Sequence, residues 1–264
     1  PRSTLFLHDA LPICKCILKH LQPPQQLMEA LEQQYAFDFS DQVRYADMKK
    51  QMQQQFVKTG TTICGVIFDK GVVIAADTRS TGGHIVADRN CKKIHFISDK
   101  IYCCGAGTAA DTFAVTDMAR DQLALLSMKT GRSPLVGVAK HIICNHLFRY
   151  QGGVSAALVM GGVDSQGVHL VAIAPHGSYD HLPYATLGSG SLAAQSVLDT
   201  HYRANMTQEE AVELAIMAIE AGIINDMGSG SNVDCCIITK EKTDFIRSIK
   251  KTGTESAGKN AEFI

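Results

Sequence analysis

The chain has 264 residues, 45% of them hydrophobic and 19% charged, which is typical of one large globular domain with a tail rather than a fibrous or disordered chain. Its formal net charge of -1 at pH 7 gives no electrostatic reason to expect binding to nucleic acid or to a membrane surface. No apolar run reaches the roughly 18 residues that a membrane-spanning helix requires.

The nine cysteines lie mostly within apolar runs and lack the spacing of metal ligands. This pattern predicts buried, reduced thiols and a protein of a reducing compartment. Cys14 and Cys16 form too short a pair to hold zinc alone. The six thiols that we expect to be buried are Cys64, Cys103, Cys104, Cys144, Cys235 and Cys236.

We interpret residues 1–60 as a removable pro-segment. Residues 14–60 are rich in Gln and Lys and show no strong core-facing pattern. His8 and Asp9 interrupt the apolar stretch in residues 1–13, which disfavours a signal peptide, and this stretch need not be native sequence. An ordinary N-terminal extension would have the same composition, so composition does not separate these interpretations.

The polar segment ends at Gly60-Thr61, where a strand-like pattern begins. Cleavage before Thr61 would leave a free α-amine beside the hydroxyl, and an α-amine with a pKa of about 7.7–8.0 can act as a base near neutral pH. One residue would then supply both nucleophile and base, while Gly60 would keep the cleaved carbonyl open to attack. The alternative is a Thr-rich strand start after a linker glycine, because such tripeptides are common.

From Thr62 onward the residues alternate with the period of strands, and later stretches have the period of helices. Asp69-Lys70-Gly71 predicts a hairpin turn between the first two strands, and a second strand pair is expected at 84–88 and 93–98. The predicted strands cover 61–69, 71–78, 84–88, 93–98, 100–107, 154–162, 167–174, 184–187 and 233–239. The predicted helices cover 108–129, 134–150, a stretch after Gly190 to about 202, and 207–225.

Two of the predicted helices carry N-terminal capping signals. Ser133-Pro134 predicts an N-cap followed by the first helical residue. Thr207 and Glu210 have the spacing of a capping box, in which each side chain bonds the backbone of the other residue.

The order of elements is strands, two helices, strands, two helices and a final strand. Two sheets packed face to face, with helices outside both, would cover every apolar face, so we expect an α+β fold with four layers, αββα. The residues after 240 are mostly polar, and we assign 246–264 to a C-terminal tail.

Two charged residues lie at the ends of apolar strands. Lys93 begins the strand at 93–98, where an inward-facing lysine needs a partner, and Asp77 near the end of the preceding apolar run can be that partner. A lysine near Thr61 would favour the deprotonated form of a hydroxyl that is otherwise a poor nucleophile. Taken singly, each charge is more simply explained as a strand end that reaches solvent.

The motifs that combine these residues are Thr61-Thr62-Ile63-Cys64-Gly65, Ala75-Ala76-Asp77-Thr78-Arg79, Lys93-Ile94, Gly105-Ala106-Gly107-Thr108-Ala109-Ala110-Asp111 and Gly228-Ser229-Gly230-Ser231-Asn232-Val233-Asp234. Over about residues 61–245 they resemble the catalytic beta subunits of the 20S proteasome. The stretches 90–97, 148–152 and 187–194 are similar to the beta-2 (beta type-7) group of that family. The resemblance implies a fold of the N-terminal nucleophile hydrolase type over 61–245 and a threonine endopeptidase of trypsin-like specificity.

The resemblance also implies a role for each matching residue. Thr61 matches the nucleophile released by cleavage at Gly60-Thr61, and the backbone N–H of Gly107 matches the oxyanion donor, where the lack of a side chain permits close approach. The remaining matches are the acidic and basic members of the catalytic set, followed by the group that holds the threonine amine: Asp77, Lys93, Ser189, Asp226 and Ser229.

Three residues match the substrate pocket: Thr81, Gly105 and Phe113. Gly105 is small and leaves a deep pocket for a long side chain, as a trypsin-like subunit requires. Phe113 departs from the pattern, because the matching position is often acidic in that subunit and would attract a basic P1 residue. A neighbouring subunit can supply the acid instead, so preference for Arg or Lys is a hypothesis.

The resemblance further implies assembly with other alpha and beta subunits in stacked heptameric rings, unfolded polypeptides as substrates, and a location in cytoplasm and nucleus. It implies no metal ion and no organic cofactor, and neither nucleic acid nor a membrane as a partner.

Two other readings belong to different classes. The stretch 188–193 imitates a dinucleotide-binding fingerprint, but the chain there runs from helix into helix and lacks the βαβ unit that such a site needs. A noncatalytic subunit that only builds the ring would keep its Thr61 amine blocked. His95 alternates with apolar residues on a strand, which favours a packed or interface residue over a ligand.

Overall fold

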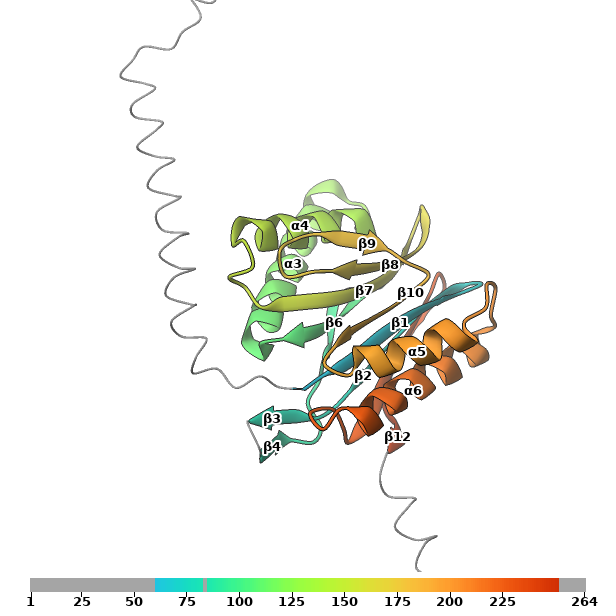
Figure 1. Ribbon diagram of the computed structural model, residues 1–264. Helices are drawn as coiled ribbons and strands as arrows, with labels where there is room; N and C mark the ends of the chain where they lie inside the picture. Colours follow the sequence, from blue (N-terminus) through green and yellow to red (C-terminus); the bar gives the residue numbers. More distant parts are fainter. Residues whose placement is uncertain (1–59, 83–84, 252–264) are drawn as a thin grey trace, which may run out of the picture. The chain divides into compact units, whose positions relative to one another are not determined.

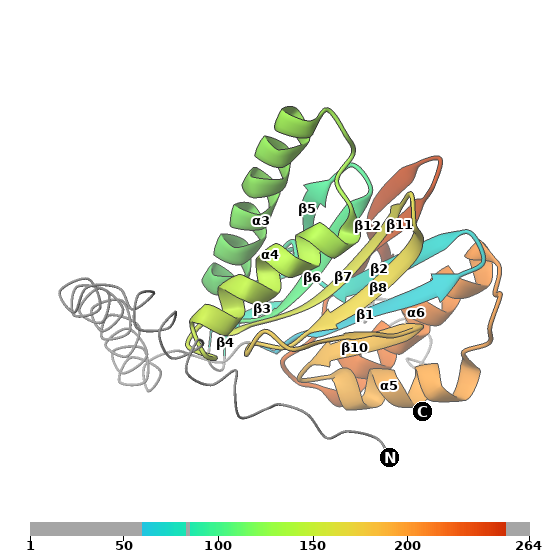
Figure 2. The same ribbon diagram turned by 90° about the horizontal axis from the view of Figure 1, so that it is seen from above.

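A computed structural model describes residues 60–82 and 85–251. Within these residues, two five-stranded antiparallel sheets lie face to face, with two helices on the outer side of each (Figure 1; Figure 2). The expected α+β fold with four αββα layers is therefore confirmed. The predicted pro-segment lies outside the described residues, apart from Gly60.

The first sheet has the strand order β10-β1-β2-β11-β12. The loop Asp69-Lys70 joins β1 to β2 with Phe68 paired to Gly71, as the turn sequence predicts. The strands are β1 Thr62–Phe68, β2 Gly71–Asp77, β10 Tyr184–Gly188, β11 Asn232–Thr239 and β12 Thr243–Lys251.

The second sheet has the order β5-β6-β7-β8-β9, and a separate hairpin joins β3 to β4. The second sheet contains β5 Ile94–Ser98, β6 Ile101–Gly107, β7 Ala156–Asp164, β8 Gly167–Ile173 and β9 Tyr179–His181. The hairpin consists of β3 Ser80–Gly82 and β4 Ile85–Asp88.

Helices α3 Ala109–Thr130 and α4 Val136–Arg149 cover the second sheet, while α5 Ser191–His201 and α6 Gln208–Asn225 cover the first. The capping box at the start of α6 is present, with Thr207 Oγ1 accepting from Glu210 N and Glu210 Oε2 accepting from Thr207 N. This start of α6 is thus set by local sequence.

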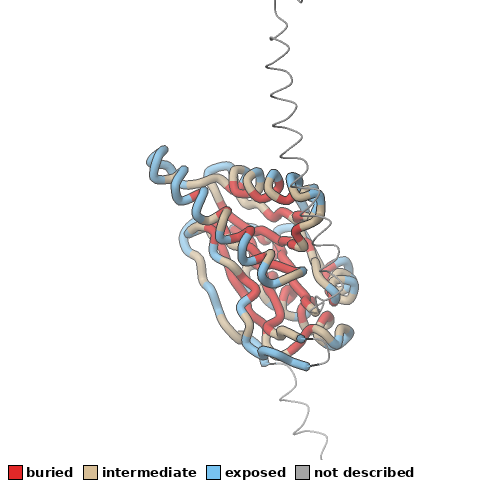
Figure 3. The backbone as a smooth tube through the Cα atoms, turned by 90° about the vertical axis from the view of Figure 1, so that its left-hand side faces the viewer, coloured by how far each residue is buried: buried red, intermediate tan, exposed pale blue. Residues whose placement is uncertain are grey.

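Three apolar clusters fill the spaces between the four layers. Figure 3 shows that the buried stretches of the backbone run through the interior of the domain. The middle cluster joins the facing sides of the two sheets and includes Ile63, Ile74 and Leu170. The outer clusters join each sheet to its helices. The six cysteines expected to be buried are buried and free: Cys64, Cys103, Cys104, Cys144, Cys235 and Cys236.

Glycines allow the two sheets to approach closely. A Cβ on Gly65 of β1 would lie 2.5 Å from Leu170 Cδ1, and a Cβ on Gly161 of β7 would lie 2.9 Å from Ile74 Cγ2. Large side chains of one sheet therefore fill the space above glycines of the other.

Three expectations about elements are wrong. The helix α4 begins at Val136 after Leu135, so Ser133-Pro134 is not its cap. β4 pairs with β3 and β5 pairs with β6, so 84–88 and 93–98 are not a pair. The chain is not a simple polar tail from 246, because β12 continues to Lys251 and pairs with β11 as an edge strand, where one polar face is acceptable.

Candidate active site

Thr61 lies directly before β1 and is 4% exposed. Its amide nitrogen donates to Ser189 Oγ at 3.0 Å, and its carbonyl accepts from the Gly190 amide at 3.3 Å. Gly188 has a φ of +100°, and a Cβ there would lie 2.1 Å from the Thr61 carbonyl oxygen. The glycine-rich turn between β10 and α5 therefore holds Thr61, which is a different use from the dinucleotide binding that its sequence imitates.

Lys93 and Asp77 form a buried ion pair beside the Thr61 hydroxyl. Lys93 Nζ lies 2.7 Å from Asp77 Oδ1 and 3.1 Å from Thr61 Oγ1. The side chain of Asp77 is inaccessible to solvent and that of Lys93 is 9% exposed. An ammonium that donates to a hydroxyl oxygen favours the deprotonated, nucleophilic form of that hydroxyl.

The Asp77 carboxylate is fixed by backbone donors as well as by the ammonium. Thr62 N donates to Oδ1 at 3.0 Å, and Gly230 N donates to Oδ2 at 3.1 Å. Arg79 N also donates to Oδ2, at 3.3 Å. These donors compensate the burial of the charge, since an ionised carboxylate only accepts hydrogen bonds.

The peptide bond before Thr61 lies against the same groups. Thr61 Oγ1 donates to the Gly60 carbonyl oxygen at 2.8 Å, and Lys93 Nζ donates to that oxygen at 3.2 Å. A Cβ on Gly60 would lie 2.1 Å from Gly228 Cα, so only glycine fits at this position. The hydroxyl, the carbonyl and a cation are thus grouped at one bond.

Asp226 joins the two predicted serines next to Thr61. Its Oδ2 accepts from Ser189 Oγ at 2.5 Å and from Ser229 Oγ at 2.6 Å. Burial acts to raise the pKa of Asp226, but the hydrogen bonds from Ser189, Ser229 and the Gly228 amide outweigh it and hold this pKa below its usual value. The carboxylate therefore stays ionised and orients Ser189, which accepts from the Thr61 nitrogen.

Gly107 is the last residue of β6 and has a φ of +120°. Within the described residues no hydrogen bond joins it to Gly60 or Thr61. A Cβ at this position would lie 2.3 Å from the Ser155 carbonyl oxygen, so the backbone here needs glycine for both conformation and space. Its role as an oxyanion donor stays a prediction.

The three predicted pocket residues lie on different elements. Thr81 Oγ1 accepts from Gly60 N at 3.4 Å, and Gly105 N donates to the Lys93 carbonyl at 3.1 Å. Phe113 is 43% exposed on α3, and its ring contacts that of His95 edge-on, with centroids 4.6 Å apart. Burial lowers the pKa of His95, with Asp117 acting in the opposite direction, so the packed His95 that we expected is held toward its neutral form.

One buried contact was missed from the sequence. Thr62 Oγ1 lies 2.8 Å from Ser229 Oγ, and both residues are buried. Thr62 follows the predicted nucleophile directly, but only the fold reveals that its hydroxyl reaches a loop so distant in sequence. It extends the polar group around Asp226 into the core.

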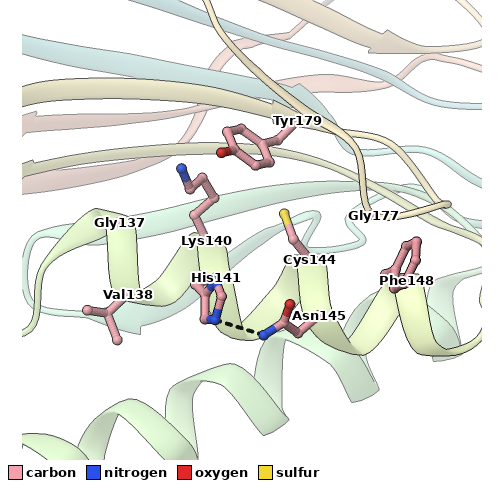
Figure 4. Close-up of a pocket in the computed structure, with 9 residues that line it drawn as sticks. All are labelled: Gly137, Val138, Lys140, His141, Cys144, Asn145, Phe148, Gly177 and Tyr179. Carbon is pink, nitrogen blue, oxygen red and sulfur yellow. Dashed lines mark hydrogen bonds between the residues drawn. The ribbon is translucent and has the colours of Figure 1, made fainter. Parts of the chain in front are cut away.

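A cavity of about 460 Å³ lies elsewhere, between α4 and the turn before β9 (Figure 4). Lys140 and Phe148 line it, and Lys140 Nζ lies 3.8 Å from the centroid of the Tyr179 ring. None of the residues predicted for the active site lines this cavity.

In residues 60–82 and 85–251, no group of three or more His, Cys, Asp or Glu side chains could hold a metal ion. In the same ranges, no helix combines the length and apolar character that crossing a bilayer requires.

Comparison with known proteins identifies the family. The proteasome subunit family matches residues 57–238 of this chain. The chain is 54% identical to proteasome subunit beta type-7-B of Arabidopsis thaliana, over 81% of this chain and 78% of that protein. It is 52% identical to proteasome subunit beta type-2 of Saccharomyces cerevisiae, over 81% and 82%, and 49% identical to proteasome subunit beta type-10 of Mus musculus, over 87% and 85%.

The family match over residues 57–238 covers the polar cluster around Thr61 and the four layers, apart from β12 and the last residue of β11. Membership in this family implies assembly with other proteasome subunits, and beta-type subunits are threonine endopeptidases of the 20S particle. The chain belongs to the proteasome beta subunit family and is a peptidase subunit of the proteasome core.

Proposed function

We propose that Thr61 is the catalytic nucleophile and that the chain releases it by cutting its own Gly60-Thr61 bond. The observation that supports this most strongly is the grouping at that bond, where Thr61 Oγ1 and Lys93 Nζ both contact the Gly60 carbonyl oxygen. In this proposal residues 1–60 are the pro-segment and the hydrolase domain begins at Thr61.

Self-cleavage proceeds as an acyl transfer. Thr61 Oγ attacks the Gly60 carbonyl carbon, the C–N bond breaks, and the nitrogen takes a proton to become the Thr61 α-amine. The acyl group of Gly60 is then an ester on the hydroxyl, which water hydrolyses to the free Gly60 carboxyl and the free hydroxyl. Lys93 stabilises the negative charge that develops on the Gly60 oxygen.

Peptide hydrolysis uses the same hydroxyl with the amine now available. The proposed base is the Thr61 amine, held by Ser189 and, through it, by Asp226. Lys93 and Asp77 favour the nucleophilic form of Oγ. The Gly107 N–H donates a hydrogen bond to the oxyanion of the substrate. An ester with the acyl half of the substrate forms and is then hydrolysed.

The proposed substrates are unfolded polypeptides cut after basic residues. A Cβ on Gly105 would lie 2.9 Å from Thr112 Cβ, so the deep space expected above Gly105 is occupied by the Thr112 side chain. His95, which is held toward its neutral form, adds little repulsion to a basic P1 residue. We expect fluorogenic peptides with Arg at P1 to be cleaved faster than matched peptides with Leu or Glu. A preference for Leu would contradict basic specificity, since Phe113 would then be acting as an apolar wall.

The proposed setting is a particle of stacked heptameric alpha and beta rings in cytoplasm and nucleus. It is supported by the similarity to beta-type subunits. Native mass measurement of particles from the two cell fractions tests both the ring number and the location.

The first test is Thr61→Ala. We expect it to abolish both pro-segment removal and peptidase activity, because one hydroxyl performs both reactions. The measurement is the intact mass and N-terminal sequence of the subunit from assembled particles, with Thr62→Ser as a control that keeps the neighbouring hydroxyl. If the Ala variant still had its N-terminus at position 61, another protease would be cutting the junction.

A further inference from the structure

The backbone of Gly107 and Thr108 is held by a short turn from another part of the chain. Thr108 N donates to the Ser155 carbonyl oxygen at 2.9 Å. A Cβ on Gly107 would lie only 2.3 Å from this same carbonyl oxygen. The position of the Ser155 carbonyl therefore constrains the position of the Gly107–Thr108 segment.

Asp111 holds the backbone of Ser155 at its N–H, in the peptide group before the one that carries the carbonyl. Asp111 lies in the first turn of α3, and its Oδ2 accepts a hydrogen bond from Ser155 N at 2.9 Å. An acidic residue in a first helical turn is also favoured by the helix dipole. Thr108 is the N-cap of α3, so the backbone of Ser155 bonds two groups at the same helix start, its carbonyl to Thr108 N and its N–H to Asp111.

The other acidic side chains in the middle of α3 do not share this position. Asp117 and Asp121 pair with Arg120 on the exposed side of the helix, at 2.7 and 3.0 Å. Their side chains are 53% and 67% exposed. These two residues therefore serve as internal comparisons for Asp111.

We propose that Asp111 is a positioning residue that fixes the Gly107 N–H for its role as oxyanion donor, acting through the backbone of Ser155. This inference rests on the proposed function of Gly107. An oxyanion donor must lie at about 2.7–3.1 Å from the developing charge, so a small displacement of Gly107 weakens it. Without the Asp111 carboxylate the partly buried Ser155 N–H loses its acceptor, and the turn that contacts Gly107 loses one of its hydrogen bonds to the start of α3.

The proposal separates the two reactions of Thr61. The Gly60 carbonyl oxygen already accepts from Lys93, whereas a peptide substrate places its oxyanion at Gly107. Asp111 is therefore needed for peptide hydrolysis and not for removal of the pro-segment.

The experiment compares assembled particles that carry Asp111→Ala, Asp111→Asn or the control Asp121→Ala. For each, the N-terminal mass reports processing, and an Arg-P1 fluorogenic peptide gives kcat and KM. Two inhibitors of the same peptide sequence are also compared. A peptide aldehyde forms a hemiacetal with the Thr61 hydroxyl and uses the oxyanion donor, whereas the corresponding peptide alcohol does not.

In Asp111→Ala we expect normal processing, KM within about twofold, and kcat reduced about 10- to 100-fold, somewhat less than full loss of one oxyanion donor. Aldehyde affinity should fall by a similar factor while alcohol affinity is unchanged. Asp111→Asn should retain most of the activity, because its amide oxygen can accept from Ser155 N. Asp121→Ala should match the unmodified particle.

Unchanged kcat and aldehyde affinity in Asp111→Ala would overturn the proposal. So would equal losses of aldehyde and alcohol affinity, or loss of processing, because either indicates a general structural role. Asp111→Glu provides a second variant that keeps the charge but displaces the acceptor oxygen, and undiminished kcat in it would also contradict us. Failure of the proposed function is recognised separately, by residual peptidase activity in Thr61→Ala.

Discussion

At the scale of single residues, Lys93 contacts the hydroxyl and the carbonyl oxygen at the junction. Its ammonium donates to Thr61 Oγ1, to the Gly60 carbonyl and to Asp77. Asp77 in turn accepts from three backbone amides, so it keeps hydrogen-bond donors when the ammonium is removed. The chemistry and the stability of this cluster are therefore partly separable.

We expect Lys93→Ala to lose peptidase activity, by about a hundredfold or more, while the subunit still assembles. The remaining amide donors to Asp77 limit the cost of leaving a buried carboxylate without its cation. Activity and native mass of purified particles are the measurements, and exposed Lys92→Ala is the matched control. An active Lys93→Ala particle would remove Lys93 from the mechanism.

The pairing of Lys93 with Asp77 could be expected from the sequence, because a charged residue at the end of an apolar strand needs a partner. The fit between Gly60 and Gly228 could not be expected, since it depends on two backbones that meet from opposite ends of the domain. The Asp111–Ser155 hydrogen bond could not be expected either, because a backbone amide as the donor leaves no signal in the residue type.

At the scale of elements, local signals were reliable where they are self-contained. The capping box of α6 needs only Thr207 and Glu210, and it is present. The predicted start of α4 was wrong because a Ser-Pro pair is compatible with a helix start but does not require one. The packing of the helix determines where it begins. β12 was not predicted because its residues do not alternate regularly between buried and exposed positions. This is common for an edge strand, whose partner is set by the whole sheet.

We expect Thr207→Ala to lower the free energy of opening of the first turn of α6 by about 1 kcal/mol, because Glu210 N loses its acceptor. Hydrogen exchange in the assembled particle should show roughly fivefold lower protection of that turn, if exchange follows its local opening. Thr207→Ser keeps the hydroxyl and should retain protection. Equal protection in the Ala and Ser variants would mean that packing alone holds the turn.

At the scale of the whole domain, the candidate active site is built from both sheets. Asp77 ends β2 of the first sheet, whereas Lys93 directly precedes β5 of the second. Their 2.7 Å contact thus depends on the distance between the sheets. Gly65 and Gly161 permit the close approach that this distance requires.

We expect Gly161→Ala to destabilise the subunit by about 1–3 kcal/mol, because its Cβ would meet Ile74 and Val72 in the closely packed centre. Gly137→Ala is the matched control, since a Cβ there meets nothing within 4 Å and alanine favours the helix. Thermal melting of particles should show a lower midpoint for Gly161→Ala and no loss for Gly137→Ala. A midpoint at or above the unmodified value for Gly161→Ala would show that the sheets can separate without cost.

The intact bond between Gly60 and Thr61 has a consequence for timing. In the proposed self-cleavage, Lys93 and the hydroxyl already contact this bond in the folded chain before any cut is made. Once folding is complete, loss of the pro-segment should follow a single exponential without a lag. Its rate should then be that of bond chemistry and not that of a slow conformational step.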